Sequence, residues 1–220
     1  MKYLKSAAVL FVCLFACALP AWADAPKTLF EMAGVKVEPA RLSNSVLIII
    51  DAQREYVDGA LPLTGVNEAI AEIEQLLKRA RKSGTPVIHV VHKGKGRLFN
   101  PEGKYFEIVP ALHPQDGETV IEKTRVSSFA DTKLEGGIQR SGKRNLIIVG
   151  FMTHNCVSST ARAARDLGYV PTLVAAATAT RDLPDGKGGI VPAVAVQAGS
   201  LAALADRTAW VVQAGRDIQE

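Results

Sequence analysis

Ser45-Val46-Leu47-Ile48-Ile49-Ile50 forms a continuous apolar run of strand length. A run without polar alternation is typical of a strand that is buried on both faces of a parallel sheet. Similar runs predict further strands at residues 86–91, 118–123, 146–149, 170–175 and 209–212. The signal at 118–123 is the weakest of these, because Glu122 lies inside the run.

Amphipathic segments separate the predicted strands. Asn67 caps a helix whose apolar residues, at 70, 73, 76 and 77, recur at helical spacing until Ser83-Gly84 ends it. Further helices are predicted at 133–140, 156–167 and 191–204. Repeated strand, helix, strand units predict a single three-layer α/β domain over residues 45–220. Its mainly parallel sheet of about six strands would have helices on both faces, as in Rossmann-like folds.

The N-terminus has the pattern of a secretory signal. Two lysines precede a thirteen-residue apolar run from Ala7 to Leu19, and Ala21-Trp22-Ala23 follows. At 1.5 Å per residue the run reaches about 20 Å, too short to span a membrane. We therefore predict export to the periplasm or the exterior, with residues 1–23 removed after Ala23 and 24–44 left as an N-terminal arm. Lipoprotein processing at Cys17 stays open as an alternative.

The composition is that of a soluble globular protein. Of 220 residues, 48% are apolar and 22% are charged, which excludes disorder, collagen and coiled coil for the whole chain. Removal of residues 1–23 lowers the net charge from +4 to +2 and leaves no basic run that suggests a nucleic-acid partner. No membrane association is expected after cleavage. Cys156 would remain as a lone thiol, which is buried and inert, paired between chains, or chemically used.

Three polar residues lie where predicted strands end, which is where parallel α/β sheets bind their ligands. Asp51 follows the first strand, Lys123 ends the third, and Cys156 begins a helix after the fourth. Singly, an Asp here is often a cap, a Lys a solvated side chain and a Cys a small buried apolar residue. Together they fit one mechanism. A helix N-terminus and a nearby ammonium would favour the thiolate, and Asp51 would act as general base and then general acid.

The sequence resembles the isochorismatase-like cysteine hydrolases, which include nicotinamidases and N-carbamoylsarcosine amidases. The resemblance covers residues 42–212 and is carried by three motifs: LIIIDAQ at 47–53, Glu122-Lys123 with Ser127-Ser128-Phe129, and VGFMTHNCVSSTAR at 149–162. It implies the same triad of Asp51, Lys123 and Cys156.

The resemblance also implies a cis peptide bond between Phe151 and Met152. With it, the backbone amides of Met152 and Cys156 would form an oxyanion hole. Beside these motifs, Gln53, Tyr56, Phe129 and Phe151 are candidate substrate contacts.

No metal and no cofactor are expected. Metal-dependent relatives carry Asp-x-His and a further His, whereas this chain has His89 and His92, which point to opposite faces of a strand. His154 lies too close to Cys156 in a tight turn to be a favoured catalytic base. Gly94 and Gly96 lack the third glycine of a dinucleotide fingerprint.

Three functions remain open at this stage. The favoured one is hydrolysis of a C–N bond in a small amide or carbamoyl compound through a thioester on Cys156. The second is hydrolysis of a vinyl ether such as isochorismate, in which Asp51 protonates the substrate and the thiol is incidental. The third is a thiol-sensing or binding domain without catalysis. The resemblance implies a homodimer or homotetramer, and residues 92–117 support no prediction.

Overall fold

A computed structural model describes residues 25–36 and 38–220. The predicted secretory signal, with Cys13 and Cys17, lies outside these residues. In the described part of the chain, no helix is both long and apolar enough to cross a membrane.

The core of the fold is a six-stranded sheet in the order β3-β2-β1-β4-β5-β8, and every neighbouring pair is parallel. Its strands are β1 Ser45–Ile50, β2 Val87–His92, β3 Thr119–Lys123, β4 Asn145–Phe151, β5 Val170–Ala179 and β8 Trp210–Val212. The predicted α/β class and the six strands are confirmed. A small antiparallel pair, β6 Leu183–Pro184 and β7 Ile190–Val191, was not anticipated from the sequence.

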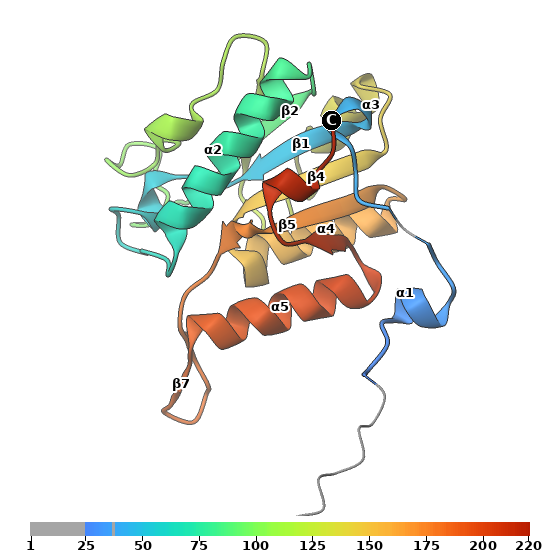
Figure 1. The fold of residues 1–220 in the computed structure, drawn as a ribbon. Helices are drawn as coiled ribbons and strands as arrows, with labels where there is room; N and C mark the ends of the chain where they lie inside the picture. The colour runs from blue at the N-terminus through green and yellow to red at the C-terminus, as the bar shows by residue number, and fades with distance from the viewer. Residues whose placement is uncertain (1–24, 37) are drawn as a thin grey trace, which may run out of the picture.

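Helices cover both faces of the sheet. The helices on the sheet are α2 Val66–Lys82, α3 Leu134–Arg140, α4 Ser158–Asp166 and α5 Ala193–Arg207, while the short helix α1, Leu29–Met32, packs against α5. Figure 1 shows α2 lying across one face, while α3 and α4 lie behind the sheet. The apolar residues form two clusters accordingly, one that contains the buried side of α2 and one that contains those of α3, α4 and α5.

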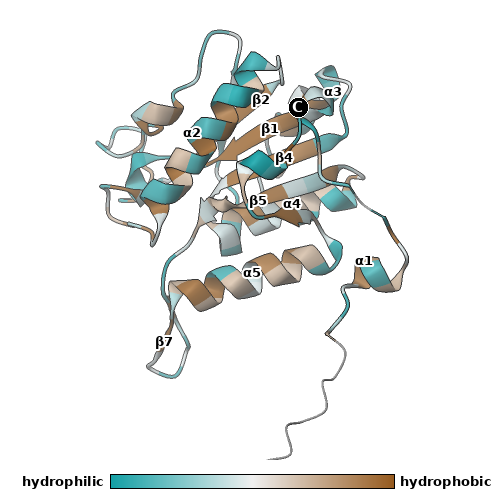
Figure 2. Ribbon diagram, in the orientation of Figure 1, coloured by the Kyte–Doolittle hydropathy of each residue, from teal (hydrophilic) through white to brown (hydrophobic). Residues whose placement is uncertain are grey.

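Strand β1 separates these two clusters. All six of its residues are buried, with Leu47 and Ile49 in the α2 cluster and Val46, Ile48 and Ile50 in the other. Figure 2 shows the central strands as the most hydrophobic part of the ribbon, whereas α2 alternates polar and apolar residues. Burial on both faces therefore explains why the sequence of β1 is apolar without alternation.

The described residues of the predicted arm, 25–36 and 38–44, include the short helix α1 and a 3-10 turn at Leu42–Asn44. The backbone N–H of Leu29 donates a hydrogen bond to Asp206 Oδ1 at 2.8 Å, near the end of α5. Phe30 is buried, and the guanidinium of Arg165 lies 5.1 Å from the centre of its ring. This part of the arm thus packs against the ends of α4 and α5.

Close contact between β1 and β4 depends on Gly150. Its φ is +109°, and a Cβ atom there would lie 2.0 Å from the carbonyl oxygen of Ile50, its partner in the register. No side chain fits at that distance. Strands β1 and β4, which precede Asp51 and Cys156, can therefore lie this close together only because residue 150 is a glycine.

Replacement of this glycine tests the contact. Gly150→Ala should lower the free energy of unfolding by more than about 3 kcal/mol, because the added carbon forces the strands apart at a strained φ. Gly142→Ala is the matched control: it has a φ of +68° but open space around it, and it should cost about 1 kcal/mol. Urea unfolding measures both. Equal losses in the two variants would contradict the close-contact account.

Candidate active site

The three residues singled out at strand ends meet at the carboxyl edge of the sheet. The side chains of Asp51, Lys123 and Cys156 are almost fully buried, with 0%, 1% and 4% of each residue exposed. Lys123 Nζ lies 2.8 Å from Asp51 Oδ2 and 3.2 Å from Cys156 Sγ. One ammonium group therefore contacts both the carboxylate and the thiol.

Local backbone geometry orients the side chains of Asp51 and Cys156. Asp51 has a φ of +49°, in the left-handed region that Asp tolerates better than most residues, so the chain turns sharply after β1. Cys156 lies in a single π-helical turn, Thr153–Val157, and α4 begins only at Ser158. The helical segment thus begins three residues before the predicted start at Cys156, as a π-helical turn that runs directly into α4. The peptide bond between Phe151 and Met152 is cis, as the resemblance implied.

Burial sets the charges of the resting site. Loss of hydration raises the pKa of Asp51 to about 6, and the opposing attraction of Lys123 is smaller. Burial, followed by the charge of Asp51, raises the pKa of Cys156 to about 12. At neutral pH the site then holds a carboxylate and a protonated thiol.

The expectation of a stabilised thiolate is corrected by this result. The ammonium of Lys123 does lower the pKa of the thiol, but desolvation and the nearby carboxylate outweigh it. The thiol is therefore protonated in the resting site, and the Asp51 carboxylate shares the Lys123 ammonium with it.

His92 is a member of the site that the sequence analysis considered only as a metal ligand. It is the last residue of β2, and its Nδ1 lies 2.9 Å from Lys123 Nζ. Burial, together with the charge of Lys123, lowers the pKa of His92 to about 4, so the ring is neutral. The rule that strand ends carry functional groups would have found it, since β2 lies between β1 and β3.

Asp51, His92 and Cys156 also offer ligand atoms within 4.8 Å of one another, a spacing that suits a metal ion. The Lys123 ammonium contacts all three of these side chains. The positive charge of Lys123 accounts for the close approach of these three side chains. His89 contacts a different partner, Glu118, at 2.9 Å.

The candidate substrate contacts differ in their surroundings. Gln53 is completely buried, and its amide accepts from His92 N and donates to the carbonyl oxygens of His92 and Phe106. Its amide is engaged by the protein, so we assign Gln53 to the frame of the site and correct the expectation of a substrate contact. Tyr56 and Phe151 are also buried and pack edge to face at 5.9 Å.

Phe129 and His154, which lie in the motifs, contact residues outside the triad. Phe129 stacks on Tyr169 with ring centres 6.0 Å apart, and Tyr169 immediately precedes β5, at the amino edge of the sheet. His154 Nδ1 lies 2.6 Å from Thr180 Oγ1, beyond the end of β5. The His154 contact agrees with the expectation that this ring points away from Cys156.

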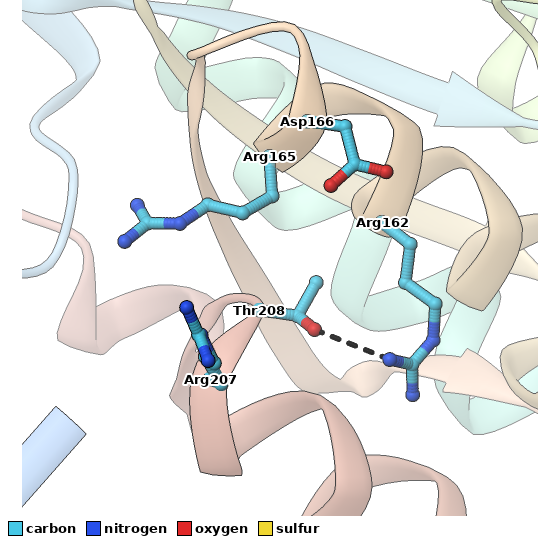
Figure 3. A pocket seen from close by; sticks show the side chains of 5 residues that line it. All are labelled: Arg162, Arg165, Asp166, Arg207 and Thr208. Atoms are coloured by element: carbon cyan, nitrogen blue, oxygen red, sulfur yellow. Dashed lines mark hydrogen bonds between the residues drawn. The ribbon is translucent and has the colours of Figure 1, made fainter. Parts of the chain in front are cut away.

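A large surface hollow lies away from the triad. It has a volume of about 480 Å³ and is lined by Arg162, Arg165, Asp166, Arg207 and Thr208. Figure 3 shows these side chains coming from the second half of α4 and from the end of α5, with Arg162 donating to Thr208 Oγ1 at 3.4 Å. Cys156 precedes the opposite end of α4, so this hollow is not the catalytic site.

Comparison with known proteins agrees with this fold. The Isochorismatase domain model matches residues 45–214. The secreted isochorismatase effector Isc1 of Verticillium dahliae is 38% identical over 156 residues, which cover 70% of this chain and 82% of that protein. Streptothricin hydrolase of Streptomyces noursei is 32% identical over 63% of this chain and 50% of its own length. Ureidoacrylate amidohydrolase RutB of Variovorax paradoxus is 28% identical over 67% of this chain and 74% of its own.

Solved structures agree with these sequence matches. The crystal structure of an isochorismatase from Pseudomonas putida KT2440 has a TM-score of 0.84 and 46% identity, covering 88% of this chain and all of that one. A second, from Oleispira antarctica, has a TM-score of 0.75 and 35% identity, covering 79% and 95%. The chain belongs to the isochorismatase family of hydrolases.

Proposed function

We propose that this protein is an exported cysteine hydrolase that cleaves a C–N bond of a small amide or carbamoyl compound without a metal. The observation that carries the proposal is the placement of a carboxylate and a thiol on one buried ammonium, with distances of 2.8 and 3.2 Å to Lys123 Nζ. Such a site can generate a thiolate only when needed and can keep its charge balanced while it does so.

The reaction begins with proton transfer. Asp51 accepts the thiol proton, and the thiolate of Cys156 attacks the carbonyl carbon, forming a C–S bond as the carbonyl electrons move to oxygen. Lys123 offsets the negative charge, which passes from the carboxylate to the sulfur. The backbone amides of Met152 and Cys156 then hold the oxyanion.

Collapse of this intermediate breaks the C–N bond. The amine or ammonia leaves with the proton that Asp51 holds, and Cys156 remains as a thioester. Asp51, ionised again, removes a proton from water, which attacks the thioester and releases the acid and the free thiol. Each proton that Asp51 accepts is returned, so one acid–base group serves both halves of the cycle.

The relatives support this choice of bond and of compartment. Streptothricin hydrolase and ureidoacrylate amidohydrolase are named as hydrolases, the second of an amide-type bond. Isc1 is named as a secreted effector, which is in line with export through the signal pattern of residues 1–23.

A second candidate is hydrolysis of a vinyl ether such as isochorismate. It is favoured by the names of the 38%-identical effector and of the 46%-identical structure, both isochorismatases. In that reaction Asp51 would donate its proton to the substrate, and no bond to sulfur would form.

Trapping of the acyl-enzyme tests the preferred function. Incubation with a library of small amides should add the mass of an acyl group to Cys156 and release ammonia or an amine. Cys156→Ala should lower turnover by about a thousandfold or more, because the nucleophile is gone. Intact mass and ammonia release measure both. The proposal fails if no amide gives turnover or an adduct.

Isochorismate separates the two chemistries. Wild-type protein and the Cys156→Ala variant are incubated with it, and product formation is followed by chromatography. We expect no turnover by either protein. Equal turnover by both would favour the vinyl-ether reaction, because that reaction does not use the thiol.

The acidic side of the profile of kcat/KM against pH reports the ionisation of the general base, Asp51. Because Asp51 must be ionised to accept the thiol proton, and burial raises its pKa to about 6, kcat/KM should rise with pH through a midpoint near 6. The profile is measured with the amide that the library identifies. A midpoint near 4, the ordinary value for an exposed Asp, would contradict this role.

A further inference from the structure

We infer that His92 is a positioning residue of this site, whose Nδ1 lone pair holds the Lys123 ammonium where it contacts both Asp51 and Cys156. This inference rests on the proposed function only for its role in the reaction, because the contact itself belongs to the resting protein. It assigns a task to a side chain that the mechanism above does not use.

The ammonium has more contacts than its three hydrogens can satisfy equally. Lys123 Nζ lies 2.8 Å from Asp51 Oδ2, 2.9 Å from His92 Nδ1, 3.2 Å from Cys156 Sγ and 3.2 Å from the carbonyl oxygen of Arg125. A lysine side chain is a flexible stem with a point charge, so its acceptors determine where the charge lies. His92 and Arg125 supply the two acceptors that do not exchange the thiol proton, and each limits movement of the charge between carboxylate and thiol.

The sheet register makes this contact a direct one. His92 and Lys123 are paired residues of the parallel strands β2 and β3, so their side chains leave the sheet on the same side. The backbone N–H of Lys93 also donates to the carbonyl oxygen of Lys123 at 2.8 Å. Imidazole and ammonium are therefore held side by side by the strands.

The imidazole is itself fixed in place. Gln53 bonds to both the N–H and the carbonyl of His92, at 2.8 and 3.1 Å. The ring packs edge to face on Phe99, with centres 5.2 Å apart. The Gln53 bonds restrain the His92 backbone, and Phe99 restrains its ring. The position of the imidazole therefore determines where the Lys123 ammonium lies.

The charge state of His92 suits an acceptor. An ammonium can donate to Nδ1 only when that nitrogen carries no proton, so the proton of the neutral ring lies on Nε2. The titratable groups beside it are Lys123, which contacts Nδ1, and Asp51 and Cys156, whose ligand atoms lie within 4.8 Å. Because Nδ1 is occupied by the ammonium, this nitrogen is not free to act as the general base.

Two substitutions separate the hydrogen bond from the packing. His92→Asn keeps an acceptor near the position of Nδ1, and His92→Leu keeps the bulk without one. The probe is iodoacetamide, and the readout is its rate of reaction with Cys156 at pH 8, followed by peptide mass. No substrate is needed, so the result is independent of whether the protein hydrolyses amides.

We expect His92→Leu to react about tenfold more slowly than wild type. A displaced ammonium stabilises less thiolate, and a lost hydrogen bond to a charged group has an effect of this size. His92→Asn should stay within about threefold of wild type. Urea unfolding verifies that both variants fold. The inference is overturned if His92→Leu reacts at the wild-type rate, or if His92→Asn is slowed as much as His92→Leu.

Discussion

The buried ammonium group of Lys123 constrains the whole carboxyl edge of the sheet. A charge with 1% of its residue exposed is stable only when other groups replace the water that it has lost. Here the replacement comes from a carboxylate after β1, a thiol after β4 and an imidazole at the end of β2. Four neighbouring strands are thus tied to one atom, and a shift of any of them would weaken the contacts that stabilise the buried charge.

This constraint explains why packing and chemistry are difficult to separate in this protein. Gly150 brings β4 against the last residue of β1, and so sets the spacing between the segments that carry Asp51 and Cys156. Gln53 ties the end of β2 to the loop after β1 through the backbone of His92. Gly150 and Gln53 thus belong to the frame of the site rather than to the triad, and each of them limits where the ammonium lies.

The strands and the convergence of Asp51, Lys123 and Cys156 could be predicted because both follow from simple patterns, whereas the order of the strands in the sheet was not predicted. Apolar runs such as 45–50 signal buried parallel strands, and polar residues at their carboxyl ends must converge. His92 satisfied the same rule, but its spacing from His89 was considered only for metal binding. The structural role of Gln53 could not be assigned from sequence, because a polar residue beside Asp51 can equally well contact the substrate or hydrogen-bond to a neighbouring strand. The protonation of Cys156 depends on burial depth, which no local pattern encodes.

In the resting site an ionised Asp51 lies beside a protonated Cys156, with Lys123 in contact with both. Carbon-13 NMR of protein labelled at the aspartate carboxyl and the cysteine Cβ tests this arrangement directly, with Asp51→Asn and Cys156→Ala to assign the two signals. We expect an Asp51 signal that titrates near pH 6 and a Cys156 signal that keeps its thiol shift at pH 7 and above. A thiolate shift for Cys156 at pH 7 together with a protonated Asp51 would contradict this arrangement.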